Sequence, residues 1–241
     1  MKKILLLLFV ALTSIESGTA QTIKGLFDKA TRSTTATSGN GLSNDEIING
    51  LKEALRIGTD SSARRLGKLD GFFGDAAIKV LMPEEAKKIE STLRSLGIGP
   101  VVDKAILSMN RAAEDAAGGV GNIFWDAIKK MSITDGLKIL RGGDFAATDY
   151  LKSVTAAELT EKFRPVIEAS LVKVDATRYW KDMFTTYNRF SGKPVNTDLA
   201  AYVTERALSG LFLKISLEEQ KIRKNPAAQV TDMLKKVFGG T

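Results

Sequence analysis

The chain contains no cysteine and no histidine. Without cysteine it cannot form a disulfide, so the folded protein must rely on its apolar core. The two absences also exclude a cysteine nucleophile, a Ser-His-Asp triad and a zinc site built from nitrogen and sulfur ligands. Catalysis would have to use carboxylate, lysine, tyrosine, hydroxyl or arginine groups, and only hard cations bound through oxygen remain as candidate metals. We therefore expect no cofactor and no metal site.

Strand-like alternation of apolar and polar residues is almost absent, and apolar residues recur instead at helical spacing. The best candidate for an extended segment is 77–82, which follows a glycine-rich turn at 70–74. No motif repeats at a fixed period, which argues against a helical solenoid. The pattern predicts an all-α fold, a single globular array of helices with at most one small hairpin or extended connector near residues 70–82.

The N-terminal residues 1–20 have the features of a secretory signal peptide. Lys2 and Lys3 precede an unbroken apolar run over residues 4–12, which is too short to span a bilayer permanently. Small and polar residues follow, which predicts cleavage before Gln21. Because there is no cysteine, a lipid anchor on a thiol is excluded. We expect an exported, soluble protein, periplasmic or otherwise outside the cytoplasm, with no transmembrane helix in its mature chain.

The mature chain divides into a short N-terminal part and one domain. Residues 21–41 combine a short amphipathic segment with a polar, flexible linker, and residues 239–241 form a short tail. Between them, residues 42–238 carry the start and stop signals of successive helices. A chain of this length buries roughly 70% of the surface that it exposes when unfolded, so one all-α domain is expected.

Several helix starts can be read from local motifs. Hydroxyl and acidic side chains three positions apart predict starts at Ser43, Ser132 and Thr155. Proline predicts two more, at Pro83 and Pro100, because its fixed backbone angle suits the first turn of a helix.

Apolar residues at helical spacing define the faces expected to be buried. Pro165 lies inside the apolar face expected after Thr155, which predicts a kink or a restart of the helix there. Helices are also expected over 123–131 and 175–190. The longest signal covers 197–224, and the Asn-Pro pair at 225–226 should open a last helix. The expected inner faces comprise Ala86, Ile89, Leu93 and Leu96 after Pro83, Val102, Ile106, Met109 and Ala113 after Pro100, and Leu159, Phe163, Ile167 and Leu171 after Thr155.

Basic residues outnumber acidic ones. The chain has a net charge of +7, and removal of residues 1–20 leaves 33 basic and 27 acidic residues, a net charge of +6. A basic protein is attracted to anionic surfaces and ligands, although a charge of this size is also ordinary for solubility. The basic doublets are separated by helix-length gaps and imply no single aromatic-lined surface, so we expect no nucleic-acid partner.

Two groups of polar residues could bind a ligand or form a polar core. Asn110, Arg111 and Glu114 share a helix whose other face is apolar, and Arg111 could hold an anion through two nitrogens of its guanidinium group. The alternative is a buried polar network that joins two helices. Tyr187 and Asn188 allow the same two interpretations.

Two adjacent carboxylates, Glu218 and Glu219, lie on the longest predicted helix. Adjacent helical positions point about 100° apart, so these side chains do not face each other as an acid and a base would. Glu219 and Arg223 are four positions apart, and we expect them to form a surface ion pair. The alternative interpretation places Glu219 in a cleft as an acid or a cation ligand.

Several long segments, in order along the chain, are GLKEALRIGT, NRAAEDAA, IFWDAIKKMSITDGLKIL, AATDYLKSVTAAEL, FRPVIEASL and the tail from DLAAYVTERALSG onward. Together they resemble a bacterial exported family catalogued as domain of unknown function four-one-nine-seven. The resemblance covers residues 42–238 and implies an exported helical protein of bacteria with a cell envelope. It implies no established activity, so no catalytic residue is carried over. One departure is the glycine-rich loop at 118–121, which we expect to be a plain connection between helices.

These features favour a non-catalytic envelope protein that binds an anionic or amphipathic partner in a groove between helices. That partner would be an anionic envelope component or a small amphipathic ligand. The alternative is a hydrolase or lyase that uses carboxylates such as Glu219, with or without a hard divalent cation. A mostly apolar groove rimmed by lysine and arginine would favour the binder, whereas converging carboxylates with a raised pKa would favour the enzyme.

Overall fold

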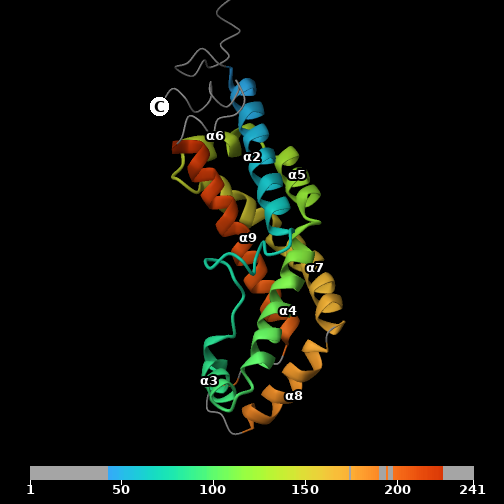
Figure 1. The fold of residues 1–241 in the computed structure, drawn as a ribbon. Coiled ribbons are helices and arrows are strands. Elements are labelled where there is room, and N and C mark those ends of the chain that lie inside the picture. The colour runs from blue at the N-terminus through green and yellow to red at the C-terminus, as the bar shows by residue number, and fades with distance from the viewer. Residues whose placement is uncertain (1–42, 174, 190–193, 195–197, 225–241) are drawn as a thin grey trace, which may run out of the picture. The chain divides into compact units, whose positions relative to one another are not determined.

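A computed structural model describes residues 43–173, 175–189, 194 and 198–224 (Figure 1). The expected signal peptide, the 21–41 segment, the helix opened at 225–226 and the 239–241 tail lie outside the described residues. Contacts divide the chain into two compact units, Met1–Ser43 and Asn44–Thr241. All the helices described below belong to the second unit.

The described residues form α-helices joined by turns and loops, and none of them lies in a β-strand. The expected all-α fold is thereby confirmed. The segment that could have been a hairpin is a loop between the first two helical elements. In chain order the elements are α2 (Asn44–Leu66), the short 3-10 turn η1 (Glu84–Ala86), α3 (Lys87–Ser95), α4 (Gly99–Ala117), α5 (Gly121–Lys130), α6 (Ile133–Arg141), α7 (Ala146–Val172), α8 (Ala176–Asn188) and α9 (Leu199–Lys224).

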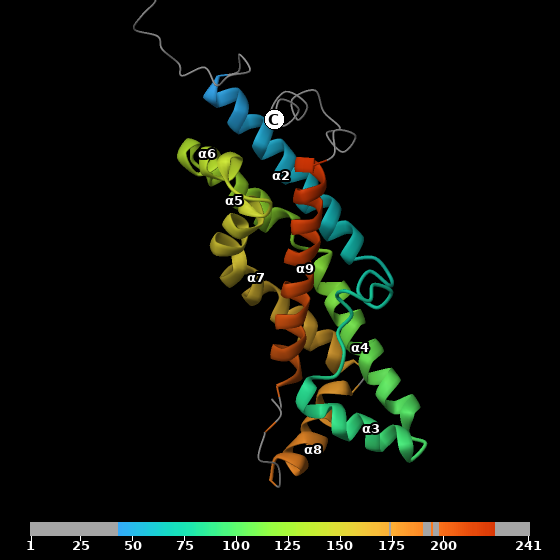
Figure 2. The same ribbon diagram turned by 90° about the vertical axis from the view of Figure 1, so that its left-hand side faces the viewer.

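The core is built around α7 and α9, which pack more extensively against each other than any other pair of helices in the described part of the chain. Helices α2 and α4 also contact α9, and Figure 2 shows α2 along its upper half and α4 along its lower half. Apolar side chains every three or four positions supply this core, because one face of each helix points inward. The fully buried side chains include Leu151, Leu159, Phe163, Ile167 and Leu171 of α7 and Val203, Ala207 and Leu211 of α9.

The helix start predicted at Thr155 is wrong. Helix α7 begins at Ala146 and continues through both Thr155 and Pro165 without interruption, so the expected restart at Pro165 is absent. The hydroxyl of Thr155 donates to the carbonyl of Leu151 at 2.7 Å instead of capping a helix. The buried stripe of α7 extends back to Leu151, and continuing the helix buries that face. The free energy gained by burying Leu151 in the core outweighs that of a local helix cap at Thr155.

The inner face predicted after Pro83 is only partly correct. Pro83 precedes η1, and Ala86 is fully buried, but α3 itself contains no buried residue. Leu96, expected inside, is 68% exposed. The physical reason is that α3 packs mainly against α4 and η1, so part of its apolar face has no partner within the described residues.

Two other predicted helix starts are confirmed. Helix α4 begins at Gly99 with proline in its first turn, and its expected inner residues Val102, Ile106, Met109 and Ala113 are buried. Before α6, the hydroxyl of Ser132 accepts from the Asp135 amide at 3.1 Å, while the Asp135 carboxylate accepts from the Ser132 amide at 3.2 Å. This reciprocal pair satisfies two of the free amides at a helix start.

The connector between α2 and η1, residues 67–83, is turned at its start and extended towards its end. Its side chains come so close to α9 that a Cβ atom on Gly210 would lie 2.8 Å from Cε1 of Phe72 and 3.1 Å from Cβ of Ile78. Only glycine leaves that space free, so Gly210 allows the connector to pack on α9. Among the described residues, no helix is long and apolar enough to cross a membrane.

Candidate functional site

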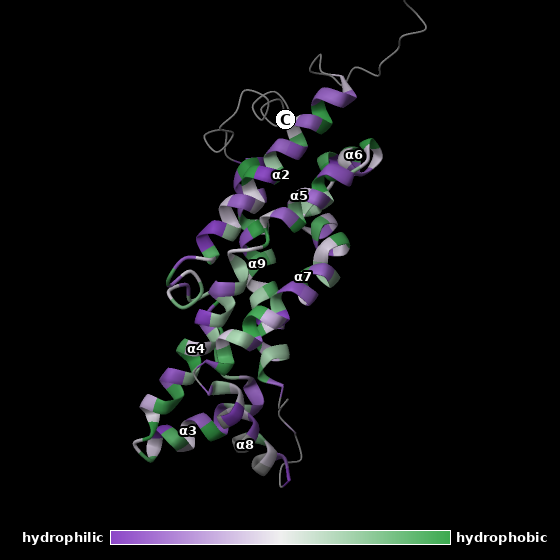
Figure 3. Ribbon diagram, turned by 90° about the vertical axis from the view of Figure 1, so that its right-hand side faces the viewer, coloured by the Kyte–Doolittle hydropathy of each residue, from purple (hydrophilic) through white to green (hydrophobic). Residues whose placement is uncertain are grey.

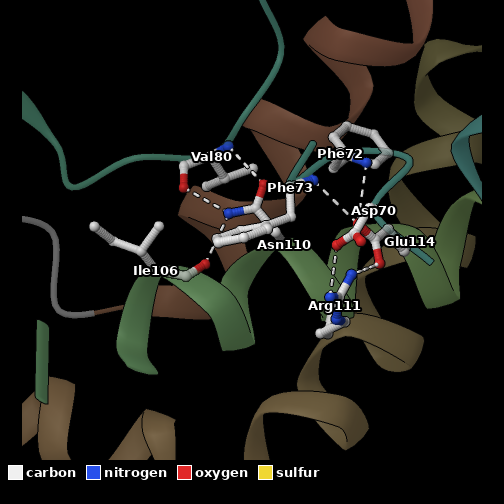
Figure 4. Close-up of polar contacts among 8 residues, drawn as sticks. All are labelled: Asp70, Phe72, Phe73, Val80, Ile106, Asn110, Arg111 and Glu114. Carbon is white, nitrogen blue, oxygen red and sulfur yellow. Dashed lines mark hydrogen bonds and ion pairs between the residues drawn. The ribbon is translucent and has the colours of Figure 1, made fainter. Parts of the chain in front are cut away.

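Asn110 joins α4 to the connector. Its side chain is fully buried, and its Oδ1 accepts from the Val80 amide at 2.8 Å while its Nδ2 donates to the Val80 carbonyl at 2.8 Å. Nδ2 also donates to the carbonyl of Ile106 at 2.7 Å. The amide side chain thus pairs with both backbone groups of one residue, as a neighbouring strand would (Figure 4). Because a buried backbone group without a partner is costly, this pairing holds the connector in place.

Glu114 and Arg111 hold the beginning of the same connector. The buried Oε1 of Glu114 accepts from the amides of Phe72 and Phe73 at 3.0 and 3.1 Å, and its Oε2 accepts from Arg111 at 2.6 Å. Arg111 also donates to Asp70 at 2.7 Å, and Figure 4 shows it between the two carboxylates. These hydrogen bonds, first that to Asp70 and then that to Glu114, raise the pKa of Arg111. Asn110 and the Arg111–Glu114 pair therefore bind the connector to α4 at two points.

The connector is also tied to α9. Lys214 of α9 forms an ion pair with Asp75, and a hydrogen bond from this ammonium group lowers the pKa of the Asp75 carboxyl. The hydroxyl of Tyr202 donates to the carbonyl of Leu81 at 2.9 Å. Burial is the main cause that raises the pKa of Tyr202, which keeps its hydroxyl protonated as a donor. Of the two interpretations of Asn110, Arg111 and Glu114, the polar network predicts partners on a second helix, whereas the partners lie mainly in this loop.

Glu219 and Arg223 form a second cluster at the start of α7. The Glu219 carboxylate accepts from the amides of Ala147 and Thr148 at 2.9 and 2.8 Å, and from the Thr148 hydroxyl at 2.7 Å. Arg223 donates to the same carboxylate at 2.9 Å and to the carbonyl of Ile139 at 2.9 Å. The expected ion pair is present, but the expectation that it lies on the surface is wrong, since Glu219 is only 8% exposed.

Glu219 is buried because its hydrogen-bond partner Ala147, at the start of α7, lies 72 positions earlier in the chain. The first amides of α7 have no partner within their own helix, and the Glu219 carboxylate supplies one as the missing cap. A negative charge is also favoured beside the positive end of a helix dipole. The carboxylate-based alternative would need Glu219 oxygens available to a substrate, whereas these oxygens already accept four hydrogen bonds.

The remaining candidates, Tyr187 and Asn188, belong to α8. Asn188 is half-buried at the C-terminal end of α8, and the side chain of Tyr187 lies outside the described part of the structure. The glycine-rich loop at 118–121 connects α4 to α5, as expected of a plain helix–helix connection. No group of three or more acidic side chains suited to a metal ion occurs within the described ranges.

Among the described residues there is also a groove that could not be located from the sequence. It has a volume of about 600 Å³ and runs along α4, with the end of α7 and the beginnings of α8 and α9 on its sides. Small side chains of α4, at Ala105, Ser108 and Ala112, leave this space open. Its apolar lining includes Met82, Leu93, Val102, Met109, Trp180 and Leu199.

Trp180 is the largest aromatic side chain in the groove. It is buried, lies 4.5 Å from the ring of Phe184 between centroids, and stacks with Tyr202 at 6.2 Å. These aromatic contacts hold the indole in one position. The small residues of α4 could have indicated a hollow from sequence, but nothing in their spacing shows which helix lies opposite.

Charged side chains border the groove on both sides of α4. Lys104, on α4, and Lys173, just after α7, have no ion-pair partner among the described residues. Asp115 is engaged by the hydroxyl of Ser170 across the groove, and Arg111 is held by its two carboxylates. The cations available to a ligand are therefore Lys104 and Lys173.

The chain was compared with family models, curated proteins and solved structures. A family model described as "Protein of unknown function (DUF4197)" matches residues 41–239. No curated protein and no solved structure matches the chain.

Proposed function

Because the chain belongs to the DUF4197 family, whose description states no activity, we propose its function from the structure: it binds one single-chain anionic amphiphile, without catalysis, in the groove along α4. The observation that carries this proposal is a mostly apolar groove bordered by two lysines that have no ion-pair partner among the described residues. A carboxylate or phosphate head group would supply that partner.

The dimensions of the groove agree with such a ligand. A volume of about 600 Å³ lies within the range of small-molecule sites, which is roughly 300–1,000 Å³. The α4 residues that line it extend from Val101 to Asp115, a rise of about 21 Å at 1.5 Å per residue. An extended hydrocarbon chain fits a long apolar groove of this kind, and its burial would supply the main binding free energy.

The two lysines lie towards different ends of the groove. Lys104 is one turn from the N-terminal end of α4. Lys173 follows Ser170, whose hydroxyl donates to Asp115 near the C-terminal end of α4. A bound amphiphile can therefore meet a cation with its head group while its chain covers the apolar lining between them.

Trp180 provides the test of this proposal. The chain has two tryptophans, and Trp125 on α5 does not line the groove. In a Trp125→Phe variant, all indole fluorescence comes from Trp180. We expect bromine-substituted undecanoate to quench it with saturation at one ligand per protein, because bromine quenches on contact. Unbrominated undecanoate should compete, and a Trp180→Phe variant, which keeps Trp125, should show no saturable quenching.

The contribution of charge is tested with Lys104→Gln and Lys173→Gln together. We expect the double variant to bind the carboxylate roughly tenfold more weakly and to bind undecanol as well as the parent does. Equal affinity of parent and double variant for the carboxylate would contradict the anionic part of the proposal. Quenching that stays linear in ligand concentration would contradict binding in the groove.

We also propose that the protein is exported and loses residues 1–20. Lys2, Lys3 and the apolar run at 4–12 support this, because they match the charged and hydrophobic parts of a secretory signal. We expect mass spectrometry of the protein isolated from its own cells to give the mass of a chain that begins at Gln21. A protein that is found in the cytoplasm with Met1 retained would contradict export.

A further inference from the structure

A small polar pocket lies between α2 and α5, which pack against each other. Its volume is about 220 Å³. Figure 3 shows α5 beside α2, with hydrophilic colouring on turns of both helices. Among the described residues, none lines both this pocket and the groove along α4. We call it the α2–α5 pocket, and its lining consists of Arg56, Thr59 and Asp60 of α2 and Gly121, Asn122 and Trp125 of α5.

Helical spacing brings the lining side chains to one side of each helix. Arg56 and Asp60 are four positions apart on α2. Asn122 and Trp125 are three positions apart on α5, so they too share one side of their helix. Gly121 is the first residue of α5, and a Cβ atom there would lie 3.4 Å from Oδ1 of Asp60. Glycine at this position therefore keeps the space beside the Asp60 carboxylate open.

Trp125 gives the pocket an aromatic wall that solvent reaches. The residue is 38% exposed, although tryptophan is highly buried on average. The ammonium group of Lys129 lies 5.7 Å from the centroid of its ring, a cation–π contact that helps to hold the indole in place. The indole nitrogen has no hydrogen-bond partner in the described part of the chain. The ring is therefore suited to stacking on a ligand and to donating one hydrogen bond.

The polar side chains of the pocket keep hydrogen-bonding groups that the described residues do not use. Asp60 forms its ion pair with Arg64 through Oδ2 at 2.9 Å, which leaves Oδ1 as an acceptor. Arg56 donates to Glu53 through Nε and Nη2, which leaves Nη1 as a donor. The side-chain amide of Asn122 makes no hydrogen bond within the described ranges, and it can both donate and accept. A ligand in the pocket therefore meets donors and acceptors together.

These features together define the chemistry of the ligand. The lining contains one basic and one acidic side chain, Arg56 and Asp60, so it has no net charge and favours a neutral ligand. A sugar ring has an apolar face of C–H groups that stacks on an indole, and each of its hydroxyls can donate and accept. The volume is below the roughly 300–1,000 Å³ of sites for drug-sized molecules, so the pocket accommodates a single ring.

We propose that the α2–α5 pocket binds one pyranose ring of a neutral glycan. The ring stacks on Trp125, and its hydroxyls donate to Asp60 and accept from Arg56. The Asn122 amide binds a further hydroxyl or an acetamido group. Because Arg56, Asn122 and Trp125 are all exposed, the bound ring can belong to a longer chain that continues into solvent. This site goes beyond the amphiphile groove and shares no lining residue with it, so each proposal stands or fails separately.

The test uses the chain from Gln21 onward with Trp180→Phe, in which Trp125 is the only tryptophan. This protein is titrated with triacetylchitotriose and with maltotriose, two neutral oligomers with and without acetamido groups. We expect at least one of them to change the fluorescence of Trp125 with saturation at one ligand per protein and a Kd of about 1 mM or lower. The arm that saturates identifies the kind of glycan. If neither oligomer gives a saturable change up to about 10 mM, the proposal is overturned.

Two variants of this protein locate the sugar in the pocket. Asn122→Ala removes an exposed side chain that makes no hydrogen bond within the described residues, and we expect about tenfold weaker binding. Gly121→Ala places a methyl group beside Asp60 and should weaken binding similarly without lowering Tm, because alanine suits a helix better than glycine.

Thr160→Ala, an exposed position on α7, is the control and should bind within about twofold of the parent. Undecanoate should leave the affinity for the sugar unchanged, since no described residue lines both sites. Parent-like affinity in both pocket variants would overturn the proposal, and so would competition by undecanoate, which would place the sugar in the groove.

Discussion

Replacing Glu219 by alanine is expected to lower the free energy of unfolding by about 3–5 kcal/mol, because it removes one member of a buried ion pair and the acceptor at a helix start. The Glu219 carboxylate accepts from the amides of Ala147 and Thr148 and pairs with Arg223, whose side chain is itself mostly buried. Removal of the carboxylate takes the acceptor from both amides and removes the ion pair with Arg223, which keeps its hydrogen bond to the Ile139 carbonyl. At roughly 2–4 °C per kcal/mol for a chain of this size, Tm should fall by about 6–20 °C.

The adjacent residue provides the control for this prediction. Glu218 forms ion pairs with Arg65 at 3.1 Å and with Lys221 at 3.8 Å, and both partners are largely exposed. Exposed pairs contribute at most about 1 kcal/mol, so Glu218→Ala should change Tm by only a few degrees. Thermal unfolding followed by circular dichroism compares the two variants. If they unfold at the same temperature, the Glu219 cluster does not stabilise α7 as described.

Replacing Asn110 by alanine is expected to cost about 2–4 kcal/mol and to loosen the connector. The substitution leaves the amide and carbonyl of Val80 without the side chain that pairs with both, and an unsatisfied buried group costs about 1–3 kcal/mol. The loss also creates a small cavity beside α4. We expect the Val80 amide to exchange its hydrogen much faster in this variant. The exchange rates of amides in the middle of α7 should change only as much as the global free energy of unfolding changes.

Ser108→Ala is the matched control on the same helix. The hydroxyl of Ser108 donates only to the carbonyl of Ala105, one turn earlier, so its removal leaves no distant group without a partner. We expect a change in unfolding free energy below about 1 kcal/mol and unchanged exchange at Val80. Denaturant unfolding gives the first quantity and hydrogen exchange gives the second. Protection at Val80 that persists in Asn110→Ala would show that the connector is held mainly by its contacts to α9.

The two polar clusters show which part of a site can be found from sequence. Asn110, Arg111 and Glu114 could be selected because polar residues next to an apolar helical face need partners. Their partners could not be selected, since Val80 and Phe72 offer backbone groups and backbone groups carry no residue signature. The same reason explains why Glu219 was expected on the surface: spacing predicts Arg223 as its neighbour but says nothing about the distant start of α7.

The groove shows a different limit. Trp180 could be assigned to an amphipathic helix, and the small residues Ala105 and Ala112 could be assigned to one side of α4. That these residues face the same hollow depends on how α8 is placed beside α4. A hollow is the volume that packing leaves unfilled, so it belongs to the arrangement of helices and to no single segment.

The sequence by itself determined the all-α fold, the buried stripes of α4 and α7, and the capped start of α6, because caps and helical faces depend on residues within one or two turns. Only the tertiary structure decided that α7 continues through Thr155, that Leu96 stays exposed and that the Glu219 carboxylate caps a helix 72 positions earlier. Each of these outcomes depends on which distant element lies opposite. Burial against that element contributes more free energy than the local signals do.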